Sequence, residues 1–432
     1  MVFGLSADEG NPITAYLLAL AGLVLALSLT GQPGVTGLPP AFVISLGGFL
    51  TVASALLLWW RGRKWLAPYG WCFLFLLATA VITTSASLCL YLSQLSIAAL
   101  TVSVGLFLVF ALVPTSYPNW TWIQAGLCWL LWISHFHGLE LYYRSSEALK
   151  STFTNPDCYS VLCLLSLFYG LGLTLHAEGK IRWLWAFGGG LSLISLLLTG
   201  SRAALLGLIA GYALLLFTLA SSRSMIYRGY ALRLILLPAA LLLFLALAGN
   251  TLHLGEKWSR LAQGQDRVAY KSRLDVVQVL PRTVARHFPL GAGPGCFHLA
   301  YQQDRPPLMA GEDYMNIAHN DYAQWLVECG LVGGVLWVLL GSGCLWVLWK
   351  SYRAPTPLVA SQIGAVVAVS TYMLFNPAYP VAELSFWMAA GLGMSASLWR
   401  LQTSLRSISW EPALFPLCLG LAVAGLWTGD FR

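Results

Sequence analysis

The stretch LLLTGSRAALLGLIAG, residues 196–211, places a single arginine between two long apolar runs. Those runs are 183–199 and 203–220. The hydrocarbon core of a bilayer is about 30 Å thick, and each run is long enough to cross it as a helix. The sequence TGSR between them is a very short turn, and the residues after it begin a helix. The stretch therefore predicts two membrane-spanning helices that meet at one membrane edge, with Arg202 at that edge.

Similar apolar runs recur along the whole chain of 432 residues. The composition is 58% hydrophobic and only 9% charged, with a mean hydropathy of +0.71, whereas soluble globular proteins carry about 25% charged residues. This excludes a set of soluble domains and predicts an all-α polytopic membrane protein with about 12–13 transmembrane helices.

Charge and cysteine content add little about partners. A net charge of +7 in a membrane protein reflects topology and contact with membrane lipids, so no nucleic acid is expected as a partner. The nine cysteines are scattered without CxxC or metal-ligand spacing and are typical of small apolar residues. Cys158 and Cys296 both fall in predicted extramembrane segments, but we do not expect a disulfide between them.

The apolar runs divide the chain into three parts: residues 1–249 with nine spans, a long hydrophilic loop at 250–328, and residues 329–432 with the C-terminal spans. The thirteen candidate spans are 12–30, 41–60, 68–88, 96–113, 120–136, 159–175, 183–199, 203–220, 233–249, 329–349, 357–375, 384–399 and 412–428.

Basic residues in the short connections predict the orientation. Twelve of the 24 lysines and arginines fall on one side of the membrane if the N-terminus is cytoplasmic, as the positive-inside rule requires. Two longer segments, 137–158 and 250–328, are then exoplasmic. Within the second, residues 266–288 are predicted to be helical up to Pro281, and GAGPG at 291–295 breaks the helix.

Two arginines are candidates for binding an anion at the exoplasmic edge. An arginine at membrane depth costs several kcal/mol unless it is compensated, so Arg202 beside Ser201 is either functional or snorkels to the interface. A helix that begins there would point its free N–H groups at the same place, which favours an anion. Arg273 lies on the predicted loop helix among other basic residues and is either part of a solvated face or a second diphosphate contact.

His319 adjoins both the loop and a span, in the sequence NIAHNDYAQWLVECGLVGG at 316–334. It is either a general base, because histidine titrates near neutral pH, or a structural residue that starts the helix together with Asn320 and Asp321. The spacings HxxxH and HExxH are missing, so no metal site is expected.

TFTNPDCY at 152–159 precedes another apolar run. Its Asn155-Pro156-Asp157 is first of all a turn and a helix start, and the side chains of Asn155 and Asp157 are candidates for lining the same cavity as Ser201 and Asn320.

These elements together resemble the O-antigen ligase and polymerase superfamily. The similarity rests on TGSRAALLGL, on SRLDVVQVLPRTVARHFPLGAGPGCF in the loop, and on the run H-N-x7-E-x-G-x-x-G at 319–333, with FTNPD at 153–157 as a weaker element. Order, spacing and the large loop also match, over roughly residues 120 to 400. The chain departs from the family in its thirteen apparent spans, where about twelve is usual, and in Asp157, where asparagine is common.

The resemblance implies a GT-C-type membrane glycosyltransferase in the bacterial inner membrane, with its site on the periplasmic side and no cofactor. The donor would be a glycan on undecaprenyl diphosphate, and the acceptor a glycan or lipid A-core. Arg202 and Arg273 would match the arginines that bind the diphosphate, and His319 the histidine that activates the acceptor hydroxyl.

Two other functions stay open at this point. The first is transfer of the glycan to a protein serine or threonine by the same superfamily. The second is a polysaccharide or lipid transporter or flippase, but transporters usually show repeated halves and broken helices near mid-membrane. Here we find no repeat, and the polar residues gather at one edge, which favours an enzyme.

Overall fold

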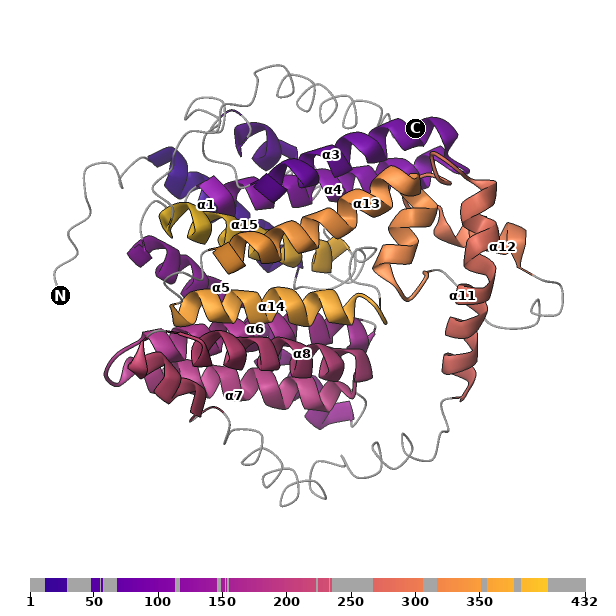
Figure 1. The fold of residues 1–432 in the computed structure, drawn as a ribbon. Helices are drawn as coiled ribbons and strands as arrows, with labels where there is room; N and C mark the ends of the chain where they lie inside the picture. The colour runs from indigo at the N-terminus through magenta and orange to yellow at the C-terminus, as the bar shows by residue number, and fades with distance from the viewer. Residues whose placement is uncertain are drawn as a thin grey trace.

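The computed structural model is a bundle of apolar helices with two less apolar helices, α11 and α12, at one end (Figure 1). It describes residues 12–28, 48–54, 56, 68–112, 117–145, 149–151, 153, 155–222, 224–232, 234, 267–305, 317–350, 356–376 and 382–402.

Helices make up the regular structure of this part of the chain, and it contains no strand. The α-helices are α1 (Pro12–Ser28), α3 (Pro68–Thr83), α4 (Leu90–Leu112), α5 (Tyr117–Ser145), α6 (Pro156–His176), α7 (Ile181–Thr199), α8 (Arg202–Ala220), α11 (Arg267–Arg286), α12 (Phe297–Asp304), α13 (Asp321–Lys350), α14 (Pro357–Tyr372) and α15 (Ala382–Gln402). A 3-10 turn, η2, covers Thr84–Ala86. Within the described residues, five helices are long and apolar enough to cross a membrane, which confirms the all-α polytopic membrane class.

Most predicted spans coincide with helices, and three helices run past the limits expected from the sequence. Helix α5 continues to Ser145, well beyond the span predicted at 120–136, because an i,i+4 pair between Arg144 and Glu140 at 2.6 Å supports a further polar turn. Helix α11 passes through Pro281 and ends at Arg286. Helix α13 begins at Asp321 rather than near 329. The predicted spans 41–60, 233–249 and 412–428 lie largely or wholly outside the described residues.

The helices pack through small residues where they approach most closely. A Cβ added to Gly207 or Gly211 of α8 would collide with the carbonyl oxygens of Ala368 and Gly364 in α14. Without those side chains the two backbones come into contact, as small-residue interfaces allow in membrane helices. Among the helices that the structure describes, the α8–α14 pair makes the most extensive contact, followed by α4–α15 and α6–α7.

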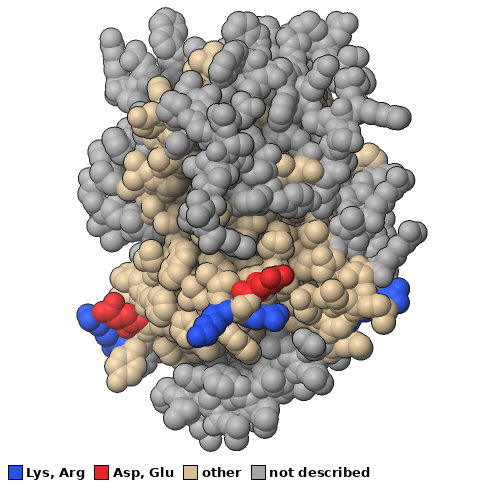
Figure 2. Space-filling view, turned by 90° about the vertical axis from the view of Figure 1, so that its left-hand side faces the viewer, with Lys and Arg blue, Asp and Glu red and all other residues tan. Residues whose placement is uncertain are grey.

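Figure 2 shows one face of the molecule, with charged side chains in a few small groups separated by wide uncharged surface among the residues drawn in colour. Large apolar side chains are exposed along the helices, including Trp183, Phe187, Ile209 and Val338. A soluble protein rarely exposes so much contiguous apolar surface. This distribution is what a bundle surrounded by lipid requires.

Candidate functional site

Several helix ends meet at the end of the bundle where α11 and α12 lie (Figure 1). The Asp321 N–H at the start of α13 donates to the Met373 carbonyl after α14, at 3.0 Å. The hydroxyl of Tyr372, the last residue of α14, donates to the Asp157 carbonyl at the start of α6, at 2.9 Å. The starts of α6 and α13 therefore both lie against the end of α14.

The turn before α13 contains His319, for which the sequence left two roles open, a general base or a structural residue that starts the helix. Asn320 is the residue that caps the helix, since its Oδ1 accepts the Ala323 N–H at 3.0 Å. Its Nδ2 also donates to the Leu374 carbonyl at 3.0 Å and fixes the turn on the end of α14. His319 precedes this cap, is half-buried, and has a positive φ of 51°. Asn320 therefore supplies a capping hydrogen bond that does not depend on the His319 side chain.

The TGSR turn has the predicted form. Helix α7 ends at Thr199, Gly200 is left-handed with φ 68°, and α8 begins at Arg202. The buried Ser201 caps α8, with its Oγ accepting the Ala204 N–H at 3.4 Å, while the Arg202 side chain is exposed. Because α8 and α14 are antiparallel, with Gly207 against Ala368, their register sets Arg202 level with Met373.

The FTNPD segment is a helix start. Asn155 caps α6, and its Oδ1 accepts the Asp157 N–H at 2.8 Å. Pro156 occupies the first position of the helix, where its missing N–H costs nothing. The structural interpretation of this motif is therefore confirmed, and the lining of a cavity by Asn155 and Asp157 stays a prediction.

Helix α11 carries Arg273, whose side chain lies outside those that the structure describes. The C-terminal end of α11 is tied to α12 by an ion pair at 2.8 Å between Arg286 and Asp304, whose side chain is fully buried. Next to it, burial lowers the pKa of His287, and the Asp304 carboxylate opposes this effect in part. This shift favours the neutral form of the His287 imidazole.

The glycine-rich segment 291–295 docks on α13 at a break in that helix. The Ala292 and Gly293 N–H groups donate to the carbonyls of Val327 at 2.8 Å and Glu328 at 2.9 Å. Gly330 has φ 65° and ψ −167°, so α13 is interrupted there and these carbonyls are exposed to the loop. The loop thus takes up backbone acceptors that an unbroken helix would use itself.

Glu328 completes this junction from inside the helix. It is almost fully buried, at 1% exposed, and its carboxylate accepts the Gly295 N–H at 2.8 Å and the Phe297 N–H at 3.3 Å. Sequence reasoning quoted this glutamate in a motif but gave it no role. The sequence did contain a signal for such a role, because Glu328 lies at the start of an apolar run. Burying its carboxylate there costs free energy, as burying the Arg202 guanidinium does, unless other groups bind it.

A buried polar pair formed by His135 and Tyr159 was not predicted from the sequence either. His135 in α5 is fully buried, and its Nδ1 is hydrogen-bonded to the hydroxyl of Tyr159 in α6. The neighbouring Ser134 is bonded to Ser151, which holds residues 149–151 against the side of α5. This pair lies beside the segment that leads into FTNPD, and it is a structural brace of the α5–α6 connection.

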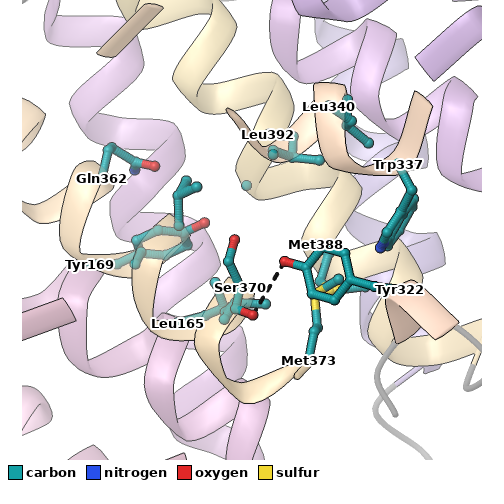
Figure 3. Close-up of a pocket in the computed structure, with 15 residues that line it drawn as sticks. Leu165, Tyr169, Tyr322, Trp337, Leu340, Gln362, Ser370, Met373, Met388 and Leu392 are labelled. Carbon is teal, nitrogen blue, oxygen red and sulfur yellow. Dashed lines mark hydrogen bonds between the residues drawn. The ribbon is translucent and has the colours of Figure 1, made fainter. Parts of the chain in front are cut away.

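An apolar cavity extends into the bundle from the first turn of α13 (Figure 3). Tyr322 stands at one side, with its hydroxyl donating to the Ser370 carbonyl at 3.3 Å. The walls come from α6, α13, α14 and α15, with Leu165, Trp337, Val366 and Leu392 among the lining residues. This lining suits hydrocarbon and not a glycan. Ser201 and Asn320 do not line it, so their predicted role in a polar cavity stays a prediction.

Gly330→Ala is expected to destabilise the protein strongly. The backbone region it occupies is accessible almost only to glycine, which costs another residue about 1–3 kcal/mol, and the added Cβ would overlap the Pro289 carbonyl oxygen. Thermal unfolding of purified protein in detergent measures the effect. Gly190→Ala, at a helical glycine of α7 with open space around it, is the matched control and should not lower the melting temperature. Equal melting temperatures for the two variants would contradict the role given to the break.

A search of curated proteins finds no match for this chain. A family model described as O-antigen ligase matches residues 187–338, from α7 into α13, a range that includes Arg202, Arg273 and His319. This match confirms, for that part of the chain, the resemblance to the O-antigen ligase and polymerase superfamily.

Proposed function

We propose that the protein transfers a glycan from undecaprenyl diphosphate to a sugar hydroxyl, in O-antigen ligation or polysaccharide polymerisation, on the periplasmic side of the bacterial inner membrane. The observation that carries this is the family match, which spans the three predicted site residues in one continuous range. The junction of α6, α13 and α14 supports it, because the turn that bears His319 lies there and the register of α8 sets Arg202 at the same level.

His319 acts as the general base in this proposal. A sugar hydroxyl is a weak nucleophile, and a base within hydrogen-bond reach removes its proton as it attacks. The new bond joins the acceptor oxygen to the anomeric carbon while the bond from that carbon to the diphosphate oxygen breaks. The proton goes to the imidazole, and the bonding electrons leave with the lipid diphosphate. A single displacement of this kind inverts the anomeric configuration.

Arg202 and Arg273 hold the leaving group. Negative charge grows on the diphosphate as the bond breaks, and fixed guanidinium groups stabilise that charge without a metal. Arg202 is the first residue of α8, so the positive end of the helix dipole acts on the same anion. The lipid tail stays in hydrocarbon, and the apolar cavity beside Tyr322 brings apolar surface to the first turn of α13.

The proposal predicts glycan transfer without a metal or a nucleotide sugar. Purified protein in proteoliposomes is given an undecaprenyl-diphosphate-linked oligosaccharide in the presence of EDTA. Lipid A-core, a second carrier-linked glycan and a serine- and threonine-containing peptide are supplied in separate reactions. We expect one of the two glycan acceptors to gain mass while free undecaprenyl diphosphate is released. Transfer to the peptide alone would instead favour protein glycosylation, and intact donor with every acceptor would overturn the proposal.

A further inference from the structure

Glu328 and Gln324 connect two parts of the site that are separated in the chain, the glycine-rich segment 291–295 and the turn before α13. On the loop side, the two carboxylate oxygens of Glu328 receive N–H groups from Gly295 and Phe297. Phe297 is the first residue of α12, so the carboxylate also holds the start of that helix. The position of Glu328 is therefore set by how the loop is docked.

On the other side, Gln324 carries the connection to His319. It lies one helical turn before Glu328, and its Nε2 donates to Glu328 Oε1 at 2.8 Å. Its Oε1 accepts the Ala318 N–H at 3.1 Å. Both side chains are buried. Ala318 is bonded directly to His319, so hydrogen bonds run from the loop through two side chains to the backbone next to the histidine.

The direction of these hydrogen bonds explains the identity of each residue. Position 324 faces a donor on one side and an acceptor on the other, and an amide is the group that satisfies both. Position 328 faces three donors, which suits a carboxylate because it is acceptor-only. His319 has a positive φ, a conformation that persists in a non-glycine residue only when its surroundings hold it. The Ala318 bond is one of the contacts that hold it.

We propose that Glu328 and Gln324 are positioning residues that set the place of His319 according to the docking of the glycine-rich segment. The inference rests on the proposed role of His319 as a base. Neither side chain needs to touch the substrates. A displacement of about 1 Å of a catalytic group lowers turnover by about 100-fold, so a change in this connection acts on kcat while donor binding by the arginines is retained.

An exchange of the two side chains tests the proposal. In Glu328→Gln an amide faces donors, and in Gln324→Glu two carboxylates face each other, so each single variant breaks the alternation of donors and acceptors. In the double variant Gln324→Glu/Glu328→Gln, the carboxylate at 324 accepts from Ala318 and from the nitrogen of the new amide, whose oxygen still accepts from Gly295. The Phe297 N–H alone loses its acceptor, so the exchange restores the connection in part. We expect each single variant to lower kcat about 10- to 100-fold with the KM for donor nearly unchanged. The double variant should recover at least about tenfold over the worse single variant.

The same variants are then compared in a His319→Ala background, in the glycan-transfer assay and at equal amounts of folded protein. If the connection acts through His319, the single variants lower the residual rate little further. Gln124→Glu is the matched control, because Gln124 is a fully buried glutamine of α5 whose amide donates to the Tyr169 carbonyl. It should reduce the amount of folded protein but not kcat. If Gln324→Glu does not fold, Gln324→Met removes the same two hydrogen bonds without adding charge and should lower kcat likewise.

The outcomes that contradict this inference differ from the one that contradicts the proposed function. Unchanged kcat in the single variants, no recovery on exchange, or equal losses with and without His319 would overturn the connection and leave His319 as the base. Normal turnover in His319→Ala itself would overturn the proposed function, and the connection with it.

Discussion

His319→Ala is expected to lower turnover by about 100- to 10,000-fold while donor binding stays largely intact, because a general base contributes roughly that factor to the rate. The structure sharpens this prediction. Helix α13 is capped by Asn320, so removing the imidazole leaves the capping hydrogen bond to Ala323 in place. Loss of activity in this variant therefore cannot come from loss of the cap.

His319→Asn is the more informative substitution. His319 has a φ of 51°, and asparagine is among the residues that adopt left-handed backbone most readily, so this variant keeps the turn. If His319 has only a structural role, His319→Asn should keep nearly full activity. A general base predicts a loss close to that of His319→Ala, because an amide does not accept a proton at neutral pH.

The measurement is glycan transfer in proteoliposomes at equal amounts of folded protein. His176→Asn is the control, since His176 is an exposed histidine at the last residue of α6, far along the bundle from the start of that helix. It should transfer glycan at the normal rate. Full activity in His319→Asn would end the general-base hypothesis and leave the arginines as the core of the site.

Local signals explain what could be predicted from the sequence. The TGSR turn was predicted because Gly200 supplies the left-handed residue and Ser201 the cap, and both act within four residues. The start of α6 was predicted for the same reason, from Asn155 and Pro156. In each case the side chain and the backbone group that it satisfies are neighbours in the chain.

Features that depend on tertiary contacts could not be predicted from the sequence. Hydropathy places the start of the tenth span near residue 329, because Asp321, Gln324 and Glu328 interrupt the apolar run before it. The helix nevertheless begins at Asp321, since Gln324 and Glu328 satisfy each other and the docked loop. The loop partners of Glu328, Gly295 and Phe297, lie about 30 positions earlier in the chain. No pattern of neighbouring residues indicates that they are its partners.

The position of Arg202 relative to the end of α14 also depends on a tertiary contact. Arg202 was a candidate on its own from the sequence, as a polar residue at a membrane edge. The register of α8 against α14 sets Arg202 level with Met373, and it depends on the close approach at Gly207 and Gly211. The sequence of α8 alone does not reveal this packing role, because it depends on the partner helix.

Arg202→Ala is expected to lower transfer by roughly 30- to 1000-fold, because one fixed charged contact to the developing anion contributes about 2 to 4 kcal/mol to the transition state. Arg202→Lys should retain more activity, since lysine keeps the charge but loses the fork geometry that binds two phosphate oxygens. The order wild type, lysine, alanine is thus the expected result, measured as kcat/KM for the undecaprenyl-diphosphate-linked donor.

Folding does not account for such a loss. Arg202 is exposed at the first position of α8, where a positive side chain is opposed by the positive end of the helix dipole. Removing it should leave stability unchanged or raise it slightly, by a few tenths of a kcal/mol. Ser201 still caps the helix in both variants. An exposed guanidinium at the start of a helix is well placed to bind an anion.

Arg182→Ala provides the matched control. Arg182 is the second residue of α7, near a helix start like Arg202, but at the opposite end of that helix from the TGSR turn. It should keep its kcat/KM. If Arg202→Ala transfers glycan at the same rate as Arg182→Ala, then Arg202 only snorkels to the membrane interface. The diphosphate would in that case need another cation, and Arg273 on α11 is the next to substitute, because it lies in the same matched range and shares the predicted role.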